Sequence, residues 1–373
     1  WYNFIVYGGL CMKSYYLMHK NNPVLEFSHY NETLKFLNRE EAPFSIRKMP
    51  ETYETIQKFC QSRVMIESRK YRDIIIRSCN VINSSPVSLC LTGGAFTFRD
   101  SYWIREKDGF ERWKDVNLYQ NKISEKLAET ALTGEESDIR ILDENEGNIS
   151  GEITGLGSKA KCFFKEGGHI CMAKHIDEDS IVAEVLSHSV AQAMNLSSAV
   201  YTREFVYDMD CSVCHIKTNE NVELITARDV LMHYECPMKF GTDYYQLFMK
   251  VDPVNFMRMQ LFDYITLNVD RNKDNFALYT ENGKVQGLYD VFDHDSCFQG
   301  ISENAIYYVT GAKFSDSYKM FRETYPGAFE KVRPDIENLY VYLKGPGKAL
   351  FDRHDRARWH GGTLRRVTML LEL

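Results

Sequence analysis

The sequence lacks a long apolar run, a cysteine framework and an excess of positive charge. None of its apolar stretches approaches the roughly 20 residues that a membrane-spanning helix needs. Its ten cysteines follow no regular spacing, which favours reduced thiols and a cytoplasmic location. The formal net charge of −7 argues against a dedicated nucleic-acid surface. We therefore expect neither a membrane nor a nucleic acid as a direct partner.

The sequence also lacks a complete glycine-rich phosphate motif. The run ISGEITGLGSKAKCFFKEGG contains Gly151, Gly155 and Gly157 but forms neither a Walker loop nor a full G-x-G-x-x-G. Glycines let backbone amides approach phosphate oxygens, and Ser158 and Lys159 add possible donors. The run is therefore a candidate phosphate loop, with a simple hairpin turn as the alternative that the glycines alone favour.

Aspartate, by contrast, is concentrated in one segment, Leu261–Ser296. The segment contains six aspartates, namely Asp263, Asp270, Asp274, Asp290, Asp293 and Asp295. Oxygen ligands without a neighbouring Cys or His pair favour hard cations such as Mg²⁺. Asp270 and Asn275 also have the spacing of the aspartate and the metal-binding asparagine in a kinase catalytic loop.

Local patterns predict the structure of this segment. The apolar run Met257–Asn268 has helical periodicity and follows Pro253, which is typical of a helix start. Phe276–Tyr279 and Val285–Tyr289 have the pattern of short strands, and an Asn-Gly pair between them is a strong signal for a tight hairpin. The segment is therefore predicted to run from a helix through a loop into a hairpin.

The predicted hairpin brings separate polar groups together. Pairing its strands across the Asn-Gly turn sets Asn275 opposite Asp290. Asn275 and residues 290–293 then emerge at one end of the hairpin, just after the loop that carries Asp270. A metal clamp with an adjacent base needs this kind of convergence. The alternative is a solvated acidic turn, which suits Asp274 better than it suits the whole set.

A calcium-binding loop is a competing interpretation of the same residues. Asp270, Asn272 and Asp274, with Glu281 in the twelfth position, match the ligand positions of an EF-hand. The sixth position, however, is Asn275 where glycine is needed, and a turn and a strand follow Glu281 in place of a helix. These departures disfavour the calcium loop.

A second formal match, Cys211-x-x-Cys214-His215, has the spacing of a haem attachment motif. Covalent haem attachment needs an exported protein and a helical surround, and the pattern here predicts a buried strand. We therefore interpret these cysteines as core residues.

A lysine on a strand and a glutamate on the next helix form the other candidate pair. Lys165 ends the predicted strand Ala160–Lys165, and Glu184 lies beside the apolar face of the helix predicted for Asp177–Asn195. Kinases hold a phosphate-binding lysine with such a glutamate. Taken alone, Glu184 is better explained as an ordinary acid at the boundary of the apolar face.

The remaining patterns divide the chain into a strand-rich part followed by a helix-rich part. In the first region, 15–27 alternates like a strand broken at Pro23 and 51–77 has a helical pattern, while 133–148 is a polar linker. Strands are predicted at 201–207 and 211–217. Further helices are predicted at 123–132, 242–250, 315–324, 328–332 and 335–343.

At this level of detail the chain resembles the HipA-like kinases. The resemblance rests, in order, on SKAKCFFK, IVAEVLSH, SSAVYTREF, ELITARD, LFDYITLNVDRNKDNF and VFDHDSCF. It covers roughly residues 90–300, and DSYWIREKDGFERWKDVNLYQN resembles a segment found in a Firmicute branch of these bacterial serine/threonine kinases. The resemblance implies an α+β, bilobal, protein-kinase-like fold. Its parts are an N-terminal accessory region (1–140), a strand-rich kinase N-lobe (141–235) and a helical C-lobe with the catalytic loop (236–373).

The resemblance also implies roles for the metal-binding and hydroxyl-binding side. Asp270 resembles the family's catalytic base, and Asn275 resembles its Mg²⁺ ligand. Asp293, in Phe-Asp-His-Asp, resembles the second metal aspartate, although Asp290 also fits a form of that motif.

On the nucleotide side, the resemblance implies that Lys165 holds the phosphates of ATP with Glu184 as its partner. Cys214 to Ile216 would offer backbone groups to adenine. Gly155 and Gly157 would belong to the phosphate loop, whose Ser158 corresponds to a serine that members often phosphorylate.

The implied activity is ATP- and Mg²⁺-dependent phosphorylation of a protein Ser or Thr, with an antitoxin or regulator as a possible partner. Alternatives are an inactive kinase-fold binding module and a small-molecule phosphotransferase. Three features depart from the family. Asn272 stands where His is common, the small N-terminal barrel is not evident in 1–90, and RARWHGGTLRRVTMLLEL at the C-terminus resembles nothing that we can place.

Overall fold

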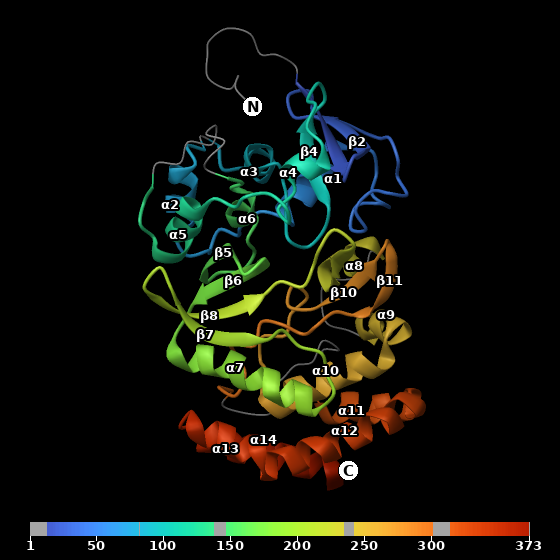
Figure 1. Ribbon diagram of the computed structural model, residues 1–373. Helices are drawn as coiled ribbons and strands as arrows, with labels where there is room; N and C mark the ends of the chain where they lie inside the picture. Colours follow the sequence, from blue (N-terminus) through green and yellow to red (C-terminus); the bar gives the residue numbers. More distant parts are fainter. Residues whose placement is uncertain (1–12, 82, 138–146, 235–241, 301–313, 373) are drawn as a thin grey trace. The chain divides into compact units, whose positions relative to one another are not determined.

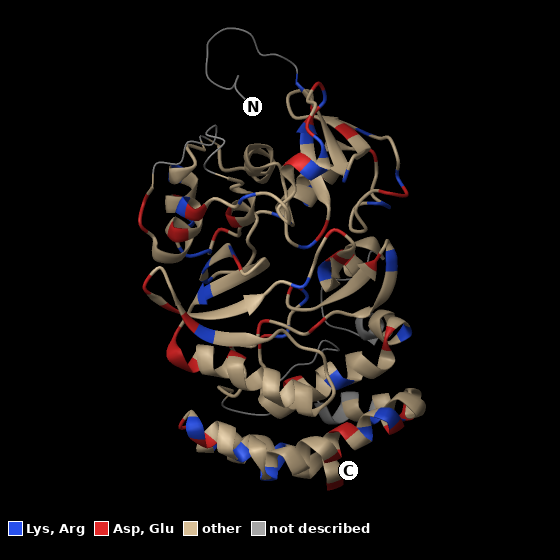
Figure 2. Cartoon of the chain, viewed as in Figure 1, with Lys and Arg blue, Asp and Glu red and all other residues tan. Residues whose placement is uncertain are grey.

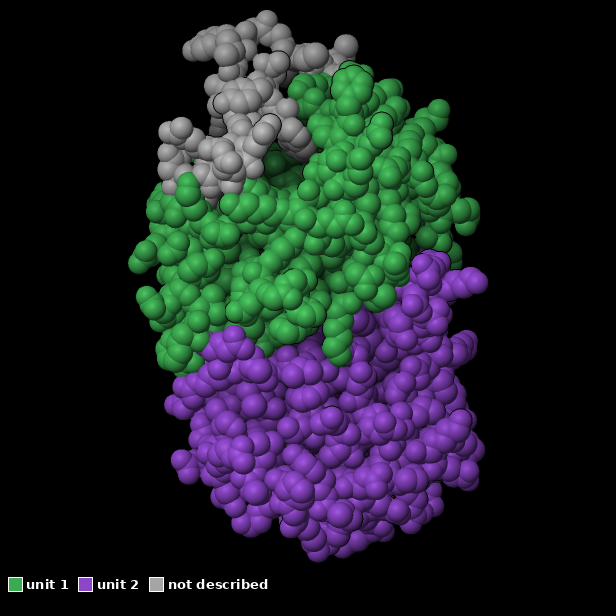
Figure 3. Space-filling model, viewed as in Figure 1, with its two compact units in different colours: residues 1–175, 205–223 green, residues 176–204, 224–373 purple. Residues whose placement is uncertain are grey.

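The computed structural model describes residues 13–81, 83–137, 147–234, 242–300 and 314–372 (Figure 1). The chain forms two compact units, which Figure 3 colours separately. Unit 1 consists of Trp1–His175 and Phe205–Glu223, and unit 2 consists of Ile176–Glu204 and Leu224–Leu373. The three-part division at 140 and 235 stays a prediction. The central part of the predicted linker, 138–146, lies outside the described residues.

Unit 1 begins with a four-stranded antiparallel sheet of order β3-β2-β1-β4. Its strands are β1 (Ser14–His19), β2 (Asn22–Ser28), β3 (Thr33–Phe36) and β4 (Tyr102–Glu106). The single strand predicted for 15–27 is thus a hairpin, in which Pro23 belongs to β2 and lies opposite Met18. The break falls at the turn before Asn22, where Lys20 adopts a left-handed φ of +51°.

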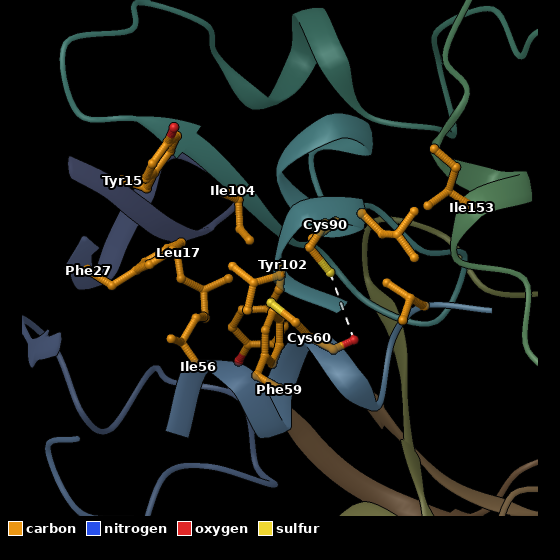
Figure 4. Close-up of a cluster of buried hydrophobic side chains, with 14 of the residues drawn as sticks. Tyr15, Leu17, Phe27, Ile56, Phe59, Cys60, Cys90, Tyr102, Ile104 and Ile153 are labelled. Atoms are coloured by element: carbon orange, nitrogen blue, oxygen red, sulfur yellow. Dashed lines mark hydrogen bonds between the residues drawn. The ribbon is translucent and has the colours of Figure 1, made fainter. Parts of the chain in front are cut away.

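Unit 1 also contains short helices. They are α1 (Tyr53–Gln61), α2 (Arg72–Ser78), α3 (Pro86–Gly93), α4 (Trp113–Val116), α5 (Glu125–Thr133) and α6 (Ser150–Ile153). The long helix predicted for 51–77 is therefore two helices. Ile56 and Phe59 on the inner face of α1 pack with Leu17 of β1 and Ile153 of α6 in one buried cluster (Figure 4).

A second sheet has the order β5-β6-β8-β7. Its strands are β5 (Ala160–Glu166), β6 (His169–His175), β7 (Tyr201–Val206) and β8 (Met209–His215). β5, β7 and β8 confirm the strands predicted at 160–165, 201–207 and 211–217, whereas β6 was not predicted. On one face, Cys162 and Cys171 pack against Ala128 of α5, whereas Phe163 on the other face contacts Phe98. This alternation is what a strand buried on both faces requires. Cys211 and Cys214 are buried in β8, as the strand interpretation predicted.

Unit 2 contains the long helices. The first four are α7 (Glu178–Ala193), α8 (Ala227–His233), α9 (Thr242–Val251) and α10 (Pro253–Thr266). As predicted, Asp177 caps α7, since its side chain accepts the N–H of Ser180, and Pro253 occupies the first turn of α10. The boundary between the two units falls within β7 and again within β9 (Val222–Thr226).

A small sheet of order β11-β10-β9 includes the predicted hairpin. β10 (Ala277–Glu281) and β11 (Lys284–Leu288) are joined by Asn282 and Gly283, whose φ angles of +49° and +77° are those that the Asn-Gly signal predicts. The register, however, shifts between Tyr279 and Thr280. Leu278 consequently lies opposite Leu288, one position away from the predicted pairing that set Asn275 opposite Asp290.

The C-terminal part of unit 2 is helical. Its helices are α11 (Phe314–Thr324), α12 (Pro326–Lys344), α13 (Pro346–Arg353) and α14 (Ala357–Glu372). The two helices predicted for 328–332 and 335–343 are one, because α12 continues through Pro334. Proline removes a hydrogen bond inside a helix, and burial of Val332, Ile336 and Leu339 on one face compensates for this loss.

The unplaced C-terminal run forms α14, whose buried Arg366 donates from Nε to the Ile265 carbonyl of α10 at 2.7 Å. Figure 2 shows Lys and Arg interspersed with Asp and Glu over α12 to α14, so neither sign dominates these helices in that view. Among the described residues, no helix is both long enough and apolar enough to cross a membrane.

Candidate active site

The predicted catalytic loop leaves the end of α10 in a hydrogen-bonded turn. The helix ends at Thr266, after which Leu267 adopts a left-handed φ of +53°. The N–H of Asn268 donates to the Asp263 carbonyl, and its side chain donates to the Asp263 carboxylate at 3.0 Å. The side-chain oxygen of Asn268 accepts the N–H of Asp270 at 3.1 Å. The position of Asp270 is therefore set by the last turn of the helix.

Arg271 and Asp263 form a buried ion pair beneath this loop. Their side chains are 4% and 3% exposed, and the Arg271 Nη2 lies 3.0 Å from an Asp263 oxygen. Nη1 of Arg271 donates to the carbonyls of Asn275 at 2.6 Å and of Phe292 at 2.8 Å. Burial raises the pKa of Asp263, and Arg271 opposes that rise. One guanidinium thus joins helix α10, the catalytic loop and the segment that carries Asp293.

Asp270 itself is exposed. The Asn275 amide donates to the Asp270 carbonyl at 2.8 Å and approaches its carboxylate at 3.4 Å, and Asn272 donates to the carboxylate at 3.3 Å. Partial burial raises the pKa of Asp270, and the charges of Asp293 and Asp295 add to this rise, while Asn272 and Asn275 counteract it. The negative charges of Asp293 and Asp295 are therefore close enough to act on Asp270.

Asp290 and Asp293 occupy different surroundings. The Ser197 hydroxyl donates to the Asp290 carboxylate at 2.5 Å. Asp293 has a left-handed φ of +62°, and its N–H donates to the Tyr201 hydroxyl at 3.0 Å. The charge of Asp293 contributes to the raised pKa of Asp270.

A second arginine holds the loop from helix α8. The guanidinium of Arg228 makes a two-point contact with the Asp274 carboxylate, with Nε 2.6 Å from one oxygen. The N–H groups of Ala227 and Arg228 donate to the carbonyls of Phe276 and Lys273 at 3.1 and 3.0 Å. Asp274 is therefore bonded to a cationic side chain, and a hairpin follows the loop, so the calcium-loop interpretation is wrong.

Asn275 provides the polar group that a metal needs from this loop. Its side chain is mostly buried and donates through Nδ2, which leaves Oδ1 as the acceptor atom. Within the described part of the chain, no three His, Cys, Asp or Glu residues form a group able to hold a metal ion. Mg²⁺ often binds through one or two carboxylates together with substrate phosphates, so one amide and one carboxylate fit a nucleotide-bound Mg²⁺.

The candidate phosphate loop in unit 1 is only partly accessible. Gly155 is buried. A Cβ atom at this position would lie 2.3 Å from Nη1 of Arg69. Gly157 has a left-handed φ of +93°, and Ser158 and Lys159 are exposed. The glycine at 155 is thus explained by packing against an arginine. Of the predicted loop residues, Gly157, Ser158 and Lys159 remain suited to a ligand.

Lys165 lies at the exposed end of β5. Its ammonium donates to the carbonyls of Tyr119 at 2.9 Å and Asn121 at 2.6 Å.

Two other lysines of the same sheet, Lys161 and Lys174, lie directly opposite each other on β5 and β6 and are 8% and 2% exposed. The sequence did not predict that these two lysines are buried, because lysine side chains are normally exposed even in apolar strands.

The other residues predicted to bind the nucleotide lie in helix α7 and at the end of strand β8. Glu184 is fully buried in α7, which is unusual for a glutamate. Cys214 pairs with Met172 in the ladder between β6 and β8, and the N–H of Ile216 donates to the Ile170 carbonyl at 2.8 Å. That amide is therefore used inside the sheet.

Sequence reasoning missed the residues that hold the loop in place, chiefly Arg271 and Arg228. One signal was present. Asp263 interrupts an apolar helical run, and a buried carboxylate requires a cationic or hydrogen-bonding partner. Arg271, eight residues later, is the partner that the structure shows.

Comparison with known proteins identifies the fold. No protein-family model and no curated protein matches the chain. Thirty-one chains of solved structures do match. One is HipA of Shewanella oneidensis MR-1, solved with HipB and its operator DNA. The TM-score is 0.62 and the identity is 11%, and the match covers 96% of this chain and 99% of that one. Another is the Helicobacter pylori proinflammatory kinase CtkA, with a TM-score of 0.38, 12% identity and coverage of 56% and 94%. The chain therefore has the HipA-like kinase fold.

Proposed function

We propose that the chain is an ATP- and Mg²⁺-dependent kinase that transfers the γ-phosphoryl group to a protein Ser or Thr hydroxyl. The observation that carries the proposal is the convergence in unit 2 of Asp270, Asn275 and Asp293 on a HipA-like fold. Asp270 is exposed, and two arginine-centred networks hold its loop in place. Membership of the Firmicute-type branch belongs to the same proposal.

Asp270 is proposed to accept the proton of the substrate hydroxyl. The hydroxyl oxygen then forms a bond to the γ-phosphorus, the bond from that phosphorus to the bridging oxygen breaks, and ADP leaves with the bonding electrons. The raised pKa of Asp270 suits a proton acceptor, because a stronger base receives the proton more readily. The chain contributes mainly positioning and charge neutralisation, as is usual in phosphoryl transfer.

Asn275 and Asp293 are the proposed Mg²⁺ ligands. Bound Mg²⁺ supplies charge neutralisation at the phosphates. Asp293 is preferred over Asp290, since its charge reaches Asp270 while the Asp290 carboxylate accepts the Ser197 hydroxyl.

The other proposed nucleotide contacts lie on unit 1. Lys165 is proposed to hold the phosphates, and Cys214 to Ile216 to contact adenine. Lys174 is a second candidate for the phosphate contact, because a buried ammonium group gains more from a phosphate than an exposed one does.

We also propose that a regulatory protein of the antitoxin type binds the chain. The support is the HipA structure with which it shares its fold, since that protein was solved together with HipB and operator DNA.

Incubation of the purified chain with Mg-ATP, followed by mass spectrometry of its peptides, tests the proposal. We expect phosphate on the exposed Ser158, and none in the same incubation of Asp270→Asn. Modification of an added protein hydroxyl supports the same conclusion. An unmodified chain that also fails to turn over ATP would overturn the kinase proposal in favour of an inactive binding module. Turnover only with small hydroxyl compounds would instead indicate a small-molecule phosphotransferase.

Asp293→Ala is expected to weaken Mg²⁺-dependent ATP binding more than Asp290→Ala does. Asp293→Ala removes a proposed direct ligand of the metal, whereas Asp290→Ala removes the acceptor of the Ser197 hydroxyl. Loss of a group that only supports metal ligands typically costs about ten- to a hundredfold in affinity, and loss of a direct ligand is expected to cost at least as much. Titration of ATP at several Mg²⁺ concentrations measures both effects. The reverse order of the two variants would assign the metal to Asp290.

A further inference from the structure

An arginine of the N-terminal region holds the base of the candidate phosphate loop. Arg69 lies between α1 and α2, and its side chain is fully buried. Nη1 donates to the Gly155 carbonyl at 2.7 Å, and Nη2 donates to the Lys161 carbonyl at 2.9 Å. These two carbonyls lie at opposite ends of the loop. A single guanidinium therefore closes the loop at its base.

Glu152 completes this contact from α6. One carboxylate oxygen lies 3.2 Å from Nη2 of Arg69, and the other accepts the N–H of Phe163 in β5 at 2.7 Å. The carboxylate consequently ties α6 to β5 on the same side as the arginine. Both side chains are at most 1% exposed, so water does not replace these bonds.

Backbone bonds continue the same attachment. The N–H of Met65 donates to the Ile153 carbonyl at 2.9 Å, and the N–H of Lys70 donates to the Ser158 carbonyl at 2.8 Å. Residues 65–70 thus run alongside residues 153–158. Ile153 also packs in the buried cluster with Ile56 and Phe59 of α1 (Figure 4).

The absence of a side chain at residue 155 also agrees with this contact. A Cβ at 155 would lie 2.3 Å from Nη1 of Arg69, closer than any real side chain approaches. Gly155 has no left-handed φ that would call for glycine. The arginine is therefore the feature that explains the glycine.

We propose that residues 65–70, acting through Arg69, form a latch that holds the 154–159 loop in one conformation. Arg69 is then a positioning residue. It sets the exposed Ser158 and Lys159 where ATP phosphates would meet them, a consequence that rests on the proposed function. The N-terminal region, which the kinase resemblance left without a role before residue 90, thereby controls the shape of the loop.

The latch can be opened without unfolding the chain. Burial raises the pKa of Glu152 to about 7, and Arg69 opposes that rise. Without the guanidinium, Glu152 takes up a proton near neutral pH in place of remaining as a buried unpaired charge. Variants at Arg69 are consequently expected to fold.

Hydrogen exchange measured by mass spectrometry on the ligand-free chain tests the latch. In Arg69→Met, amides of residues 154–161 are expected to exchange about tenfold faster or more, with a smaller increase in Arg69→Lys. Arg63→Lys is the matched control, since Arg63 is equally buried but pairs with Asp100 at 2.7 Å and bonds the carbonyls of Ala95 and Tyr102. Unchanged exchange in Arg69→Met, or an equal increase in Arg63→Lys, would overturn the latch.

Kinetics separate this inference from the proposed function. If the chain turns over ATP, Arg69→Lys is expected to raise KM for ATP about tenfold while kcat changes by less than about threefold. Faster exchange with an unchanged KM would overturn the link between latch and nucleotide. If the unaltered chain turns over no ATP, the proposed function fails, and the exchange result still decides whether the latch exists.

Discussion

We expect Asp270→Asn to reduce phosphate transfer by about 10²–10⁴-fold, the contribution of a general base, while ATP affinity stays within about twofold. The substitution keeps the shape of the side chain and the turn formed with Asn268, whose oxygen accepts the backbone N–H of Asp270. It removes the proton acceptor and one negative charge. Transfer of radiolabel from ATP measures the first effect, and a nucleotide titration measures the second.

Glu281→Gln is the matched control for this change. Glu281 belongs to the same acidic segment but is exposed at the end of β10, and its substitution removes the same charge. Near-normal transfer in Glu281→Gln, together with loss in Asp270→Asn, assigns the effect to Asp270. Transfer at a near-normal rate in Asp270→Asn would show that Asp270 is not the base.

The elements around this site could be predicted because their signals are local. Pro253 at a helix start, Asp177 as an N-cap and the Asn-Gly hairpin each depend on the geometry of a few neighbouring residues. The same locality explains the errors. A bulge in the hairpin shifted the pairing of Asn275 by one position, and packing kept α12 helical through Pro334.

The site could be predicted only as a set of polar groups. The spacing of Asp270 and Asn275 indicated the loop, and the family motif favoured Asp293 but left Asp290 as an alternative. Their difference depends on Ser197, which is distant in sequence and contacts Asp290 in the fold. In the same way, Gly155 suggested a phosphate contact until Arg69, 86 residues earlier, was seen to pack against it. Long-range partners of this kind have no periodic or local signal.

Arg271 is expected to contribute strongly to the stability of unit 2. Arg271→Met leaves Asp263 as a buried charge and removes the donor to the Asn275 and Phe292 carbonyls. Breaking a buried ion pair in this way costs about 3–5 kcal/mol of unfolding free energy. Urea unfolding measures the loss. Arg258→Met is the matched control, because Arg258 of α10 pairs with Asp335 at 2.8 Å but is more exposed, and a smaller loss is expected there.

The double variant Asp263→Leu with Arg271→Met separates stability from positioning. Replacing both charges by apolar groups removes the unpaired carboxylate, so most of the lost unfolding free energy should return. The carbonyls of Asn275 and Phe292 still lack their donor. Asn275 is a proposed metal ligand, and Phe292 precedes the other one, Asp293. We therefore expect phosphate transfer to stay low in a chain that is stable again. Recovery of transfer together with stability would show that Arg271 serves the fold alone and that the metal-binding segments need no shared anchor.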